Sequence, residues 1–459
     1  MKNVLEWLEA TVAKYPDKPA FSDTESSITF RQVYDIARNT GAYLVEQLGV
    51  DRTPVAVFAG RKMVTPAYFL GVVYAGRPYA PIDASLPDKR IEKILENLCP
   101  GAIVADRESR EHVESIVDEL AKAEGFDRPQ IFIAEDISRF EQVACADSNC
   151  KISESAGDAV TDSENDTDGG VVAGCAGKTD DSSRDMLAVV RRQMSMTDPL
   201  YIIYTSGSTG NPKGVMTSHL SLMTYINAYC DVMHIEESDV LGNQSPLDYI
   251  AAIRDIYLPL KTGCSTAIIP KEYFMEPNAL FDYMNDKKVS SVGWSVSAFT
   301  ILTSLGAFEE VGLKSLRKIC FSGSVMPCRV LRKWQENLPE AHFVNQYGPT
   351  EATASCTYYS VDHLVEEDEV LPIGKAYDNY RVFLIDEHGN DPAVGEQGEI
   401  CVCGPILALG YYNDPERTAA AFTLNPLNRL ILSGCTAPGI TEGSMKPAYF
   451  ISVDVWTAR

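Results

Sequence analysis

Several features that would place this chain in a common class of protein are scarce or missing from its sequence. No apolar run approaches the ~18 residues that a membrane-spanning helix needs, so we expect no insertion into a membrane. Lys and Arg number 40 against 64 Asp and Glu, and the resulting formal charge of −24 makes nucleic acid and anionic lipid poor partners. Histidine occurs six times, without a Ser/His/Asp arrangement that would indicate nucleophilic catalysis.

Cysteine is present, but its spacing indicates neither a metal site nor a disulfide framework. The 12 cysteines are scattered, and Cys401 and Cys403 form a C-x-C rather than half of a paired C-x-x-C motif. The N-terminal segment mixes acids and bases into its apolar positions and lacks the apolar core of a signal peptide. We therefore expect reduced, mostly buried thiols in a cytoplasmic protein.

Two parts of the chain alternate short apolar runs with helix-like stretches, between residues 53 and 133 and between residues 289 and 346. Such alternation is typical of parallel strands joined by crossover helices. Near residue 380 the pattern changes to two strand-like runs around a turn, which predicts antiparallel structure. The predicted fold class is therefore α/β, with two parallel-type αβ subdomains followed by a β-rich subdomain.

Residues 144–185 differ from the rest of the chain in composition. They are rich in Ser, Asp, Gly and Thr, with ten acids against three bases and few large apolar side chains. Such a segment buries too little apolar surface to offset the entropy of ordering it. We predict a disordered acidic insertion on the surface.

The most informative segment is YIIYTSGSTGNPKG, residues 201–214, where a β-branched and aromatic run leads into a loop of hydroxyls and glycines. Glycine lets backbone N–H groups approach a phosphate, hydroxyls add donors, and the lysine adds a cation. The lysine is preceded by Pro and followed by Gly, so this is not a Walker A loop. The predicted phosphate-binding residues are Thr205, Ser206, Gly207, Ser208, Thr209, Gly210 and Lys213.

This string resembles the phosphate-loop signature of the adenylate-forming superfamily, which includes acyl-CoA synthetases, luciferases and the adenylation domains of peptide synthetases. Three further strings resemble family motifs in the same order: GVVYAGRPYAPID at 71–83, NQYGPTE at 345–351 and GEICVCGPILALGY at 398–411. The resemblance covers residues 1–428 apart from the acidic insertion. It implies an AMP-binding large domain and an ATP-dependent ligase that uses Mg²⁺.

The resemblance also implies roles for individual residues. Tyr347 would stack on adenine, Thr350 would contact the α-phosphate, and Glu351 would hold Mg²⁺. A carboxylate would attack the α-phosphorus of ATP and expel pyrophosphate, so catalysis would rest on positioning and electrostatics. The implied catalytic residues are Thr350, Glu351 and Lys213, and the implied adenine-binding residues are Gly323, Ser324, Asn345 and Tyr347.

The string NQSPLDYIAAIRDI, residues 243–256, resembles the family segment in which an Asp pairs with the ammonium group of an amino acid substrate. Asp248 would be that acid, and D-alanine is one candidate substrate. His219 would either lie near the acyl pocket or pack locally at a helix start. The resemblance places in the side-chain pocket Tyr249, Gly293, Ser322 and Gln346, with Ala252, Cys320, Ala354 and Ser355.

The segment 429–459 departs from the family pattern. A Tyr-Arg-Thr-Gly-Asp motif and a C-terminal domain with a catalytic Lys would normally follow, and our hypothesis is a shift of reading frame near Leu430. The leading interpretation is an amino-acid-activating ligase, impaired by this change, whose acyl acceptor is a carrier protein or CoA. The alternatives are an acyl- or aryl-CoA synthetase, and a catalytically inactive nucleotide- or partner-binding fragment.

Overall fold

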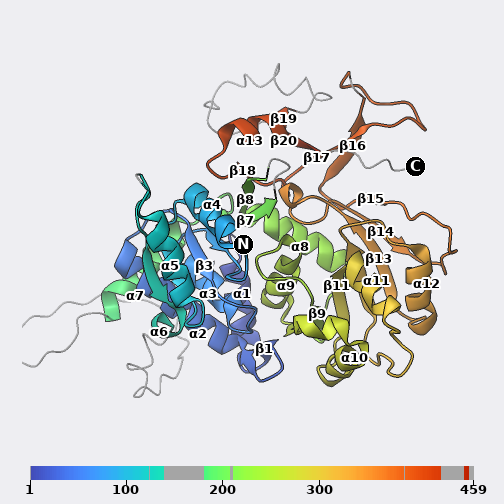
Figure 1. The fold of residues 1–459 in the computed structure, drawn as a ribbon, viewed down its shortest axis with the longest axis horizontal. Coiled ribbons are helices and arrows are strands. Elements are labelled where there is room, and N and C mark those ends of the chain that lie inside the picture. Colours follow the sequence, from blue (N-terminus) through green and yellow to red (C-terminus); the bar gives the residue numbers. More distant parts are fainter. Residues whose placement is uncertain are drawn as a thin grey trace, which may run out of the picture.

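The computed structural model describes residues 2–123, 125–138, 180–206, 210–386, 388–424 and 449–453. Two lobes, each built on a large sheet, lie side by side beneath a smaller β-rich lobe (Figure 1). The acidic insertion lies outside the described residues up to position 179. The last six residues of the predicted insertion, 180–185, belong to helix α7 (Asp180–Gln193). The predicted end of the insertion at residue 185 therefore lies six residues too far along the chain.

The first lobe contains a seven-stranded sheet in the order β18-β8-β7-β4-β3-β5-β6. From β7 to β6 the neighbouring strands are parallel, whereas β8 runs antiparallel to β7 and β18 runs antiparallel to β8. The strands are β3 (Val55–Phe58), β4 (Tyr79–Pro81), β5 (Ala102–Ala105), β6 (Gln130–Ile133), β7 (Pro199–Ser206), β8 (Pro212–Ser218) and β18 (Gly410–Tyr411).

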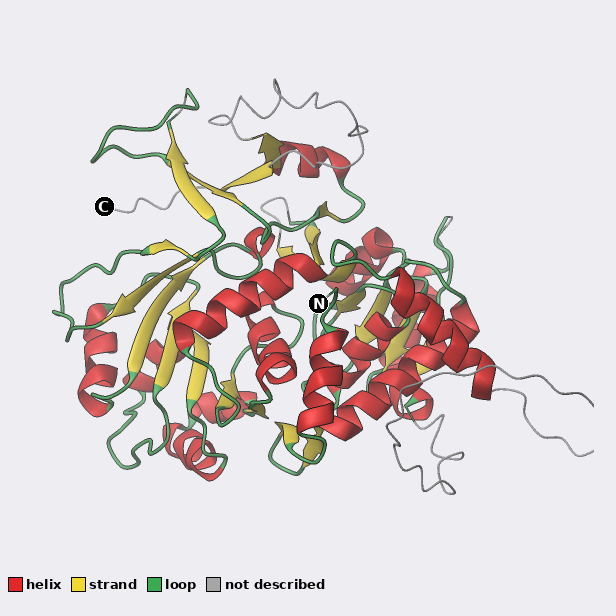
Figure 2. Ribbon diagram, turned by 180° about the vertical axis from the view of Figure 1, so that it is seen from behind, coloured by secondary structure: helices red, strands yellow, loops and turns green. Residues whose placement is uncertain are grey.

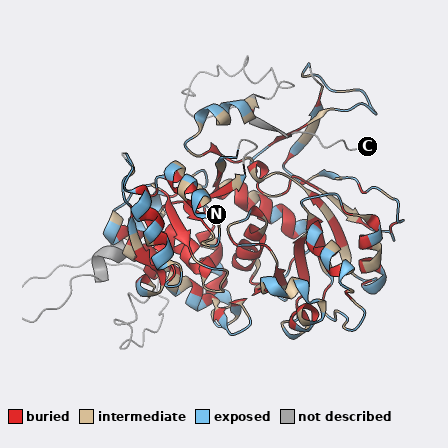
Figure 3. Cartoon of the chain, in the orientation of Figure 1, coloured by how far each residue is buried: buried red, intermediate tan, exposed pale blue. Residues whose placement is uncertain are grey.

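Both faces of this sheet are covered, because alternate side chains of its strands enter two different cores. Val55 and Val57 pack with α2 and α3, whereas Ala56 and Phe58 pack with α4 and α5 on the opposite face. The sheets of both lobes are mostly buried (Figure 3). Burial on both faces explains the near-continuous apolar runs of the sequence. The helices of this lobe are α1 (Leu5–Lys14), α2 (Phe30–Leu48), α3 (Thr65–Tyr74), α4 (Asp88–Leu98), α5 (Arg110–Leu120), α6 (Ala134–Ile137) and α7.

The second lobe contains a nine-stranded sheet in the order β15-β14-β13-β12-β11-β9-β10-β1-β2. Strands from β13 to β1 pair in parallel, and β15, β14 and β2 add antiparallel edges. The strands are β1 (Pro19–Ser22), β2 (Ser27–Thr29), β9 (Val240–Asn243), β10 (Ser265–Ile268), β11 (Ser291–Ser295), β12 (Lys318–Ser322), β13 (His342–Tyr347), β14 (Thr357–Val361) and β15 (Lys375–Ala376).

Helices pack against the second sheet, and α8 runs along the face turned toward the first lobe (Figure 2). On the other face an aromatic core forms around Trp294, Phe299 and Trp334, which contact one another edge to face or tilted. The helices are α8 (His219–Met233), α9 (Ile253–Thr262), α10 (Pro277–Asp286), α11 (Val296–Ser304) and α12 (Cys328–Asn337), with 3₁₀ turns η1 (Ile250–Ala252), η2 (Lys271–Met275) and η3 (Thr350–Ala352).

The β-rich lobe is a four-stranded sheet in the order β16-β17-β20-β19, in which every pairing is antiparallel. Strand β20 comes from the segment that departs from the family pattern, so five residues of that segment are part of this sheet. The elements are β16 (Arg381–Ile385), β17 (Glu399–Cys403), α13 (Pro415–Ala421), β19 (Phe422–Leu424) and β20 (Tyr449–Val453). The predicted fold class, two αβ subdomains and a β-rich subdomain, is confirmed.

The parallel strands of both lobes direct their carboxyl ends at a shared crevice. Residues that follow β3, β4, β9 and β10 line a single cavity of about 820 Å³ between the sheets. Open α/β sheets bind ligands outside the carboxyl ends of their strands. The fold therefore indicates that a ligand-binding site lies at this edge.

Candidate active site

The predicted phosphate loop connects two antiparallel strands, β7 and β8, rather than a strand and a helix. Thr205 lies opposite Lys213 in this hairpin, and the Oγ1 atom of Thr205 is buried without a hydrogen-bond partner among the described residues. Gly214 must be glycine, because a Cβ there would lie 2.8 Å from Ile202 and 2.9 Å from the ring of Tyr204. Of the predicted loop residues, Gly207, Ser208 and Thr209 lie outside the described residues.

Directly after the loop, Lys213 contacts the predicted magnesium ligand. Its Nζ lies 2.5 Å from Oε1 of Glu351, and the hydroxyl of Tyr411 donates to the same oxygen at 2.7 Å. Burial alone would raise the pKa of the Glu351 carboxyl, but the hydrogen bonds from Lys213 and Tyr411 outweigh it and hold the pKa below its usual value. The carboxylate is therefore ionised at neutral pH.

Tyr411 was missed as a site residue, although it ends the string GEICVCGPILALGY. It reaches the site because β18 pairs with β8, with Tyr411 opposite Val215. The Lys213 ammonium lies 4.9 Å from the centre of its ring, so one side chain provides both a hydrogen bond and a cation–π contact. The motif GEICVCGPILALGY was the sequence signal for this residue, but it does not indicate which residues Tyr411 contacts.

The predicted adenine residues lie at the carboxyl ends of β12 and β13. Asn345 pairs with Phe321 in the sheet, and its amide donates to the Pro372 carbonyl at 2.9 Å. Gly323 and Ser324 follow β12 and are exposed, and a Cβ on Gly323 would meet no atom within 4 Å. The half-buried Tyr347 ends β13, three residues before Thr350, so these residues border one open edge.

The predicted side-chain pocket falls into two groups. Gly293, Cys320 and Gln346 come from three adjacent strands and meet around Arg254, a residue to which the sequence analysis gave no role. Its guanidinium donates to the Gly293 carbonyl at 2.8 Å and to Oε1 of Gln346 at 3.1 Å. Ser355 donates to the same Gln346 oxygen at 3.5 Å, and Ser322 ends β12 two residues beyond Cys320.

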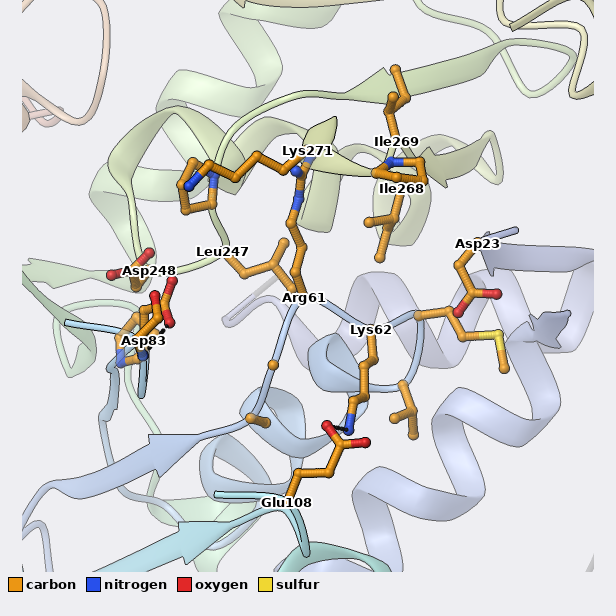
Figure 4. A pocket seen from close by; sticks show the side chains of 18 of the residues that line it. Asp23, Arg61, Lys62, Asp83, Glu108, Leu247, Asp248, Ile268, Ile269 and Lys271 are labelled. Carbon is orange, nitrogen blue, oxygen red and sulfur yellow. Dashed lines mark hydrogen bonds and ion pairs between the residues drawn. The ribbon is translucent and has the colours of Figure 1, made fainter. Parts of the chain in front are cut away.

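The second group contains Asp248, which lines the 820 Å³ cavity, and Tyr249, which lies at the surface. The carboxylates of Asp248 and Asp83 lie side by side at one end of the cavity, with Arg61 and Lys271 nearby (Figure 4). Burial, and then the charge of Asp83, raises the pKa of Asp248 to about 6. Tyr249 is 54% exposed. No hydrogen bond or ion pair within the described part of the chain joins Asp248 to the Arg254 group.

His219 begins α8 in the interior and packs locally. Its Nδ1 accepts a hydrogen bond from the Val4 N–H at 3.5 Å, and burial lowers its pKa to about 4. The imidazole is therefore neutral and serves the packing of α1 against α8, which is the second of the two predicted roles.

A sequence model of a family described as "AMP-binding enzyme" matches residues 8–412. The chain is 28% identical over 423 residues to a D-alanine–D-alanyl carrier protein ligase of Bacillus cereus (strain Q1), a match that covers 92% of this chain and 73% of the relative. A ligase of the same name from Bacillus thuringiensis (strain Al Hakam) is 29% identical over the same length and shares.

Two solved structures show the same fold. An AMPPNP-bound nonribosomal peptide synthetase, FmoA3, superposes with a TM-score of 0.74 at 21% identity, covering 98% of this chain and 40% of that one. The N-terminal subdomain of Klebsiella oxytoca NpsA, in complex with 3-hydroxybenzoyl-AMSN, superposes with a TM-score of 0.71 at 18% identity, covering 99% and 96% of the two chains. No helix within the described residues is long and apolar enough to span a bilayer. The family match over most of the chain is decisive: this chain belongs to the AMP-binding enzymes, the ATP-using adenylate-forming ligases.

Proposed function

We propose that this chain activates an amino acid as its acyl-adenylate, with release of pyrophosphate from ATP. The contact between Lys213 and Glu351 carries the proposal. A carboxylate and a triphosphate repel each other, and a chain with a formal charge of −24 needs local cations to bring them together. Lys213 supplies one such cation beside the hairpin, and Thr350 directly precedes Glu351 on η3. We assign Lys213, Thr350 and Glu351 the catalytic roles.

The residues present suit Mg²⁺ held jointly by protein and phosphate. Mg²⁺ is usually bound through one or two carboxylates plus substrate phosphates. Glu351 is an ionised carboxylate, and within the described ranges no group of three or more His, Cys, Asp or Glu side chains is placed to hold a metal alone. When bound, the ion would neutralise phosphate charge, and Lys213 would be released from Glu351 to contact the phosphates.

The nucleotide would occupy the open edge beyond β12 and β13. We assign Tyr347 to the adenine face, with Asn345, Gly323 and Ser324 around its edge. The orphaned hydroxyl of Thr205 supports a phosphate role for the hairpin, because a buried donor without a partner is unfavourable until a ligand satisfies it. The proposed phosphate set is Thr205, Ser206, Gly207, Ser208, Thr209, Gly210 and Lys213.

The pair formed by Asp248 and Asp83 supports an amino acid over a plain acid. Burial, and then repulsion by the neighbouring Asp83, raises the pKa of Asp248, and a substrate ammonium between the two carboxylates would relieve both effects. Tyr249, Gly293, Ser322 and Gln346 remain our proposed side-chain contacts. The proposed acceptor is a carrier protein, as in the ligases named above, or CoA, and we expect a cytoplasmic location.

Pyrophosphate exchange with a panel of acids tests this function. The wild type should exchange with amino acids, and Asp248→Ala should lose that activity while deaminated analogues are unaffected. Asp391→Asn, which changes an exposed acid in the loop between β16 and β17, is the matched control. Equal losses for amino acids and deaminated analogues would contradict the role of Asp248. Exchange with aryl or fatty acids alone would indicate a CoA synthetase, and ATP binding without exchange would indicate a binding fragment.

We also propose that residues 1–428 form the large domain and that the reading frame changes near position 430. Sequencing of the gene across that codon tests the second point directly. Pyrophosphate exchange by the 459-residue chain and by a frame-corrected version should then differ, because the corrected frame would supply the Tyr-Arg-Thr-Gly-Asp motif after position 430. Equal rates would contradict it.

A further inference from the structure

A buried cluster of hydrogen-bond donors surrounds Arg254, in the first turn of α9. Arg254 is 1% exposed and its guanidinium lies flat against β11, where a Cβ on Gly293 would approach its Cζ to 2.9 Å. The ring of Tyr229 lies 5.6 Å away on the α8 side. The guanidinium is therefore enclosed between the sheet and two helices.

This buried cation has no carboxylate partner. No Asp or Glu within the described residues forms an ion pair with Arg254, and its Nε has no hydrogen-bond partner. Asp255 follows in the chain and contributes some attraction, but its Oδ2 accepts from the amide of Asn243 at 2.8 Å. Arg77, also buried, is by contrast ion-paired with Asp51 and caps three backbone carbonyls. A buried guanidinium without an ion pair is costly, and Asp255 attracts Arg254 without forming one, so Arg254 has capacity for a further anionic partner.

Donors outnumber acceptors around this guanidinium. Oε1 of Gln346 already accepts from both Arg254 and Ser355, and its amide group donates to the Tyr377 hydroxyl at 2.7 Å. The Tyr225 hydroxyl is fully buried and has no hydrogen-bond partner among the described residues. The ring of Tyr225 lies 6.0 Å from the ring of Tyr229, which itself faces the Arg254 guanidinium. Burial raises the pKa of Tyr225 to about 12, and the charge of Arg254 partly offsets this effect. A site with surplus donors and a cation is complementary to an anion.

The cluster lies directly below the proposed adenylation edge. Gln346 immediately precedes Tyr347 on β13, and Cys320 lies two residues before the end of β12. The neighbours of Arg254 on β11, β12 and β13 are the same residues that were predicted to line the side-chain pocket. The donors are therefore contiguous, along β12 and β13, with the proposed adenylation edge.

We infer that the Arg254 cluster binds a second carboxylate on the acid that this ligase activates, so that the substrate is a dicarboxylic amino acid. This inference rests on the proposed function and adds the substrate class to it. Arg254 acts as a specificity residue, with Tyr225 and Gln346 as further donors. The reacting carboxylate remains near Lys213 and Glu351.

The test is calorimetric binding of non-hydrolysable aminoacyl-sulfamoyl adenosines to the 459-residue chain. Analogues with glutamyl and aspartyl side chains are compared with their glutaminyl and asparaginyl counterparts. The carboxylate forms should bind about 30-fold more tightly or better, since removing one partner of a buried charge pair has an effect of that order. Arg254→Gln should abolish this ratio and Arg254→Lys should keep part of it.

Arg77→Gln is the matched control, because it also removes a buried guanidinium but lies in the first lobe. It should lower the melting temperature without changing the affinity ratio. If Arg254→Gln does not fold, Tyr225→Phe replaces it, since that variant removes one donor while keeping the ring. Equal binding of charged and neutral analogues, or a ratio unchanged in Arg254→Gln and Tyr225→Phe, would overturn the inference while the proposed function stands. Binding of no aminoacyl analogue would overturn both.

Discussion

Lys213 and Glu351 are 138 residues apart in the chain, yet their side-chain atoms Nζ and Oε1 lie 2.5 Å apart. Lys213 is supplied by β8 of the first lobe and Glu351 by η3 of the second, so the contact joins the two lobes. The contact also pairs two opposite charges. Without it, the Lys213 ammonium would repel a metal ion and the Glu351 carboxylate would repel the phosphates of a nucleotide. We expect a bound triphosphate to separate the two side chains.

Glu351→Gln should reduce pyrophosphate exchange by about 10²–10³-fold, because the carboxylate is our proposed magnesium ligand and catalysis here is electrostatic. The glutamine still accepts from Tyr411, so the fold should be kept and the loss should fall on turnover. Raised Mg²⁺ should recover part of the rate. Glu336→Gln, which removes only an exposed helical pair with Arg332, is the control and should leave the rate unchanged. A wild-type rate in Glu351→Gln would exclude Glu351 as a ligand.

Tyr411→Phe tests the hydrogen bond to Glu351 separately from the aromatic ring. The phenyl ring keeps the cation–π contact with Lys213, whereas the 2.7 Å bond to the carboxylate is lost. A hydrogen bond to a charged group contributes about 1.5–3 kcal/mol, so the apparent affinity for Mg²⁺ should change by about 10-fold or more. Titration of exchange activity with Mg²⁺ measures this. If Tyr411→Leu behaves identically, the ring contributes nothing.

Asp248 should make the protein less stable as the pH rises. Its folded-state pKa of about 6 lies above the ordinary value of 3.8, so the folded state holds its proton more tightly than the unfolded state. The resulting stabilisation is present below pH 4 and is lost as the pH rises through 6. Asp248→Asn removes this dependence, and at pH 7 it should be more stable than the wild type by about 3 kcal/mol.

Urea unfolding of both proteins at pH 4.5 and pH 7 isolates the Asp248 contribution. Asp255 also has a pKa raised to about 6 by burial, and it is present in both proteins, so only the difference between them reports on Asp248. A difference that does not grow with pH would show that the Asp248 carboxyl is not perturbed.

Residues 144–179 should be dispensable for stability. Their composition predicts a segment without a core of its own, and long surface loops add little closure entropy. A short Gly/Ser linker in their place should leave the melting temperature nearly unchanged. The linker must stop before α7, since Leu187 and Val190 are buried against the first lobe and Arg191 pairs with Glu9.

A second deletion that extends through Arg191 provides the contrast. It removes two buried side chains and one ion pair, and it should lower the melting temperature clearly. Equal melting temperatures for the two deletions would show that α7 is not part of the folded lobe. A large drop for the shorter deletion would show that the acidic segment packs.

The sequence was sufficient for features that depend on neighbours in the chain. Period-two and continuous apolar runs predicted strands such as Val55–Phe58 and Gln130–Ile133, because side-chain direction in a strand repeats over two residues. The hydroxyl- and glycine-rich string predicted a phosphate loop for the same local reason. The resemblance of four strings then identified the family, which the family match confirms.

Tertiary structure alone decided which of these elements meet. The N-terminal strand β1 joins the second sheet beside β10 rather than the first, and β18 crosses to the first sheet and brings Tyr411 to Glu351. Nothing in the local sequence distinguishes Arg254; its proposed role follows from its enclosure by three strands and α8. Local periodicity fixes how a segment faces, but sheet order depends on which apolar faces bury each other across the whole chain. Contacts between residues distant in the chain follow from that burial, and no local sequence pattern predicts them.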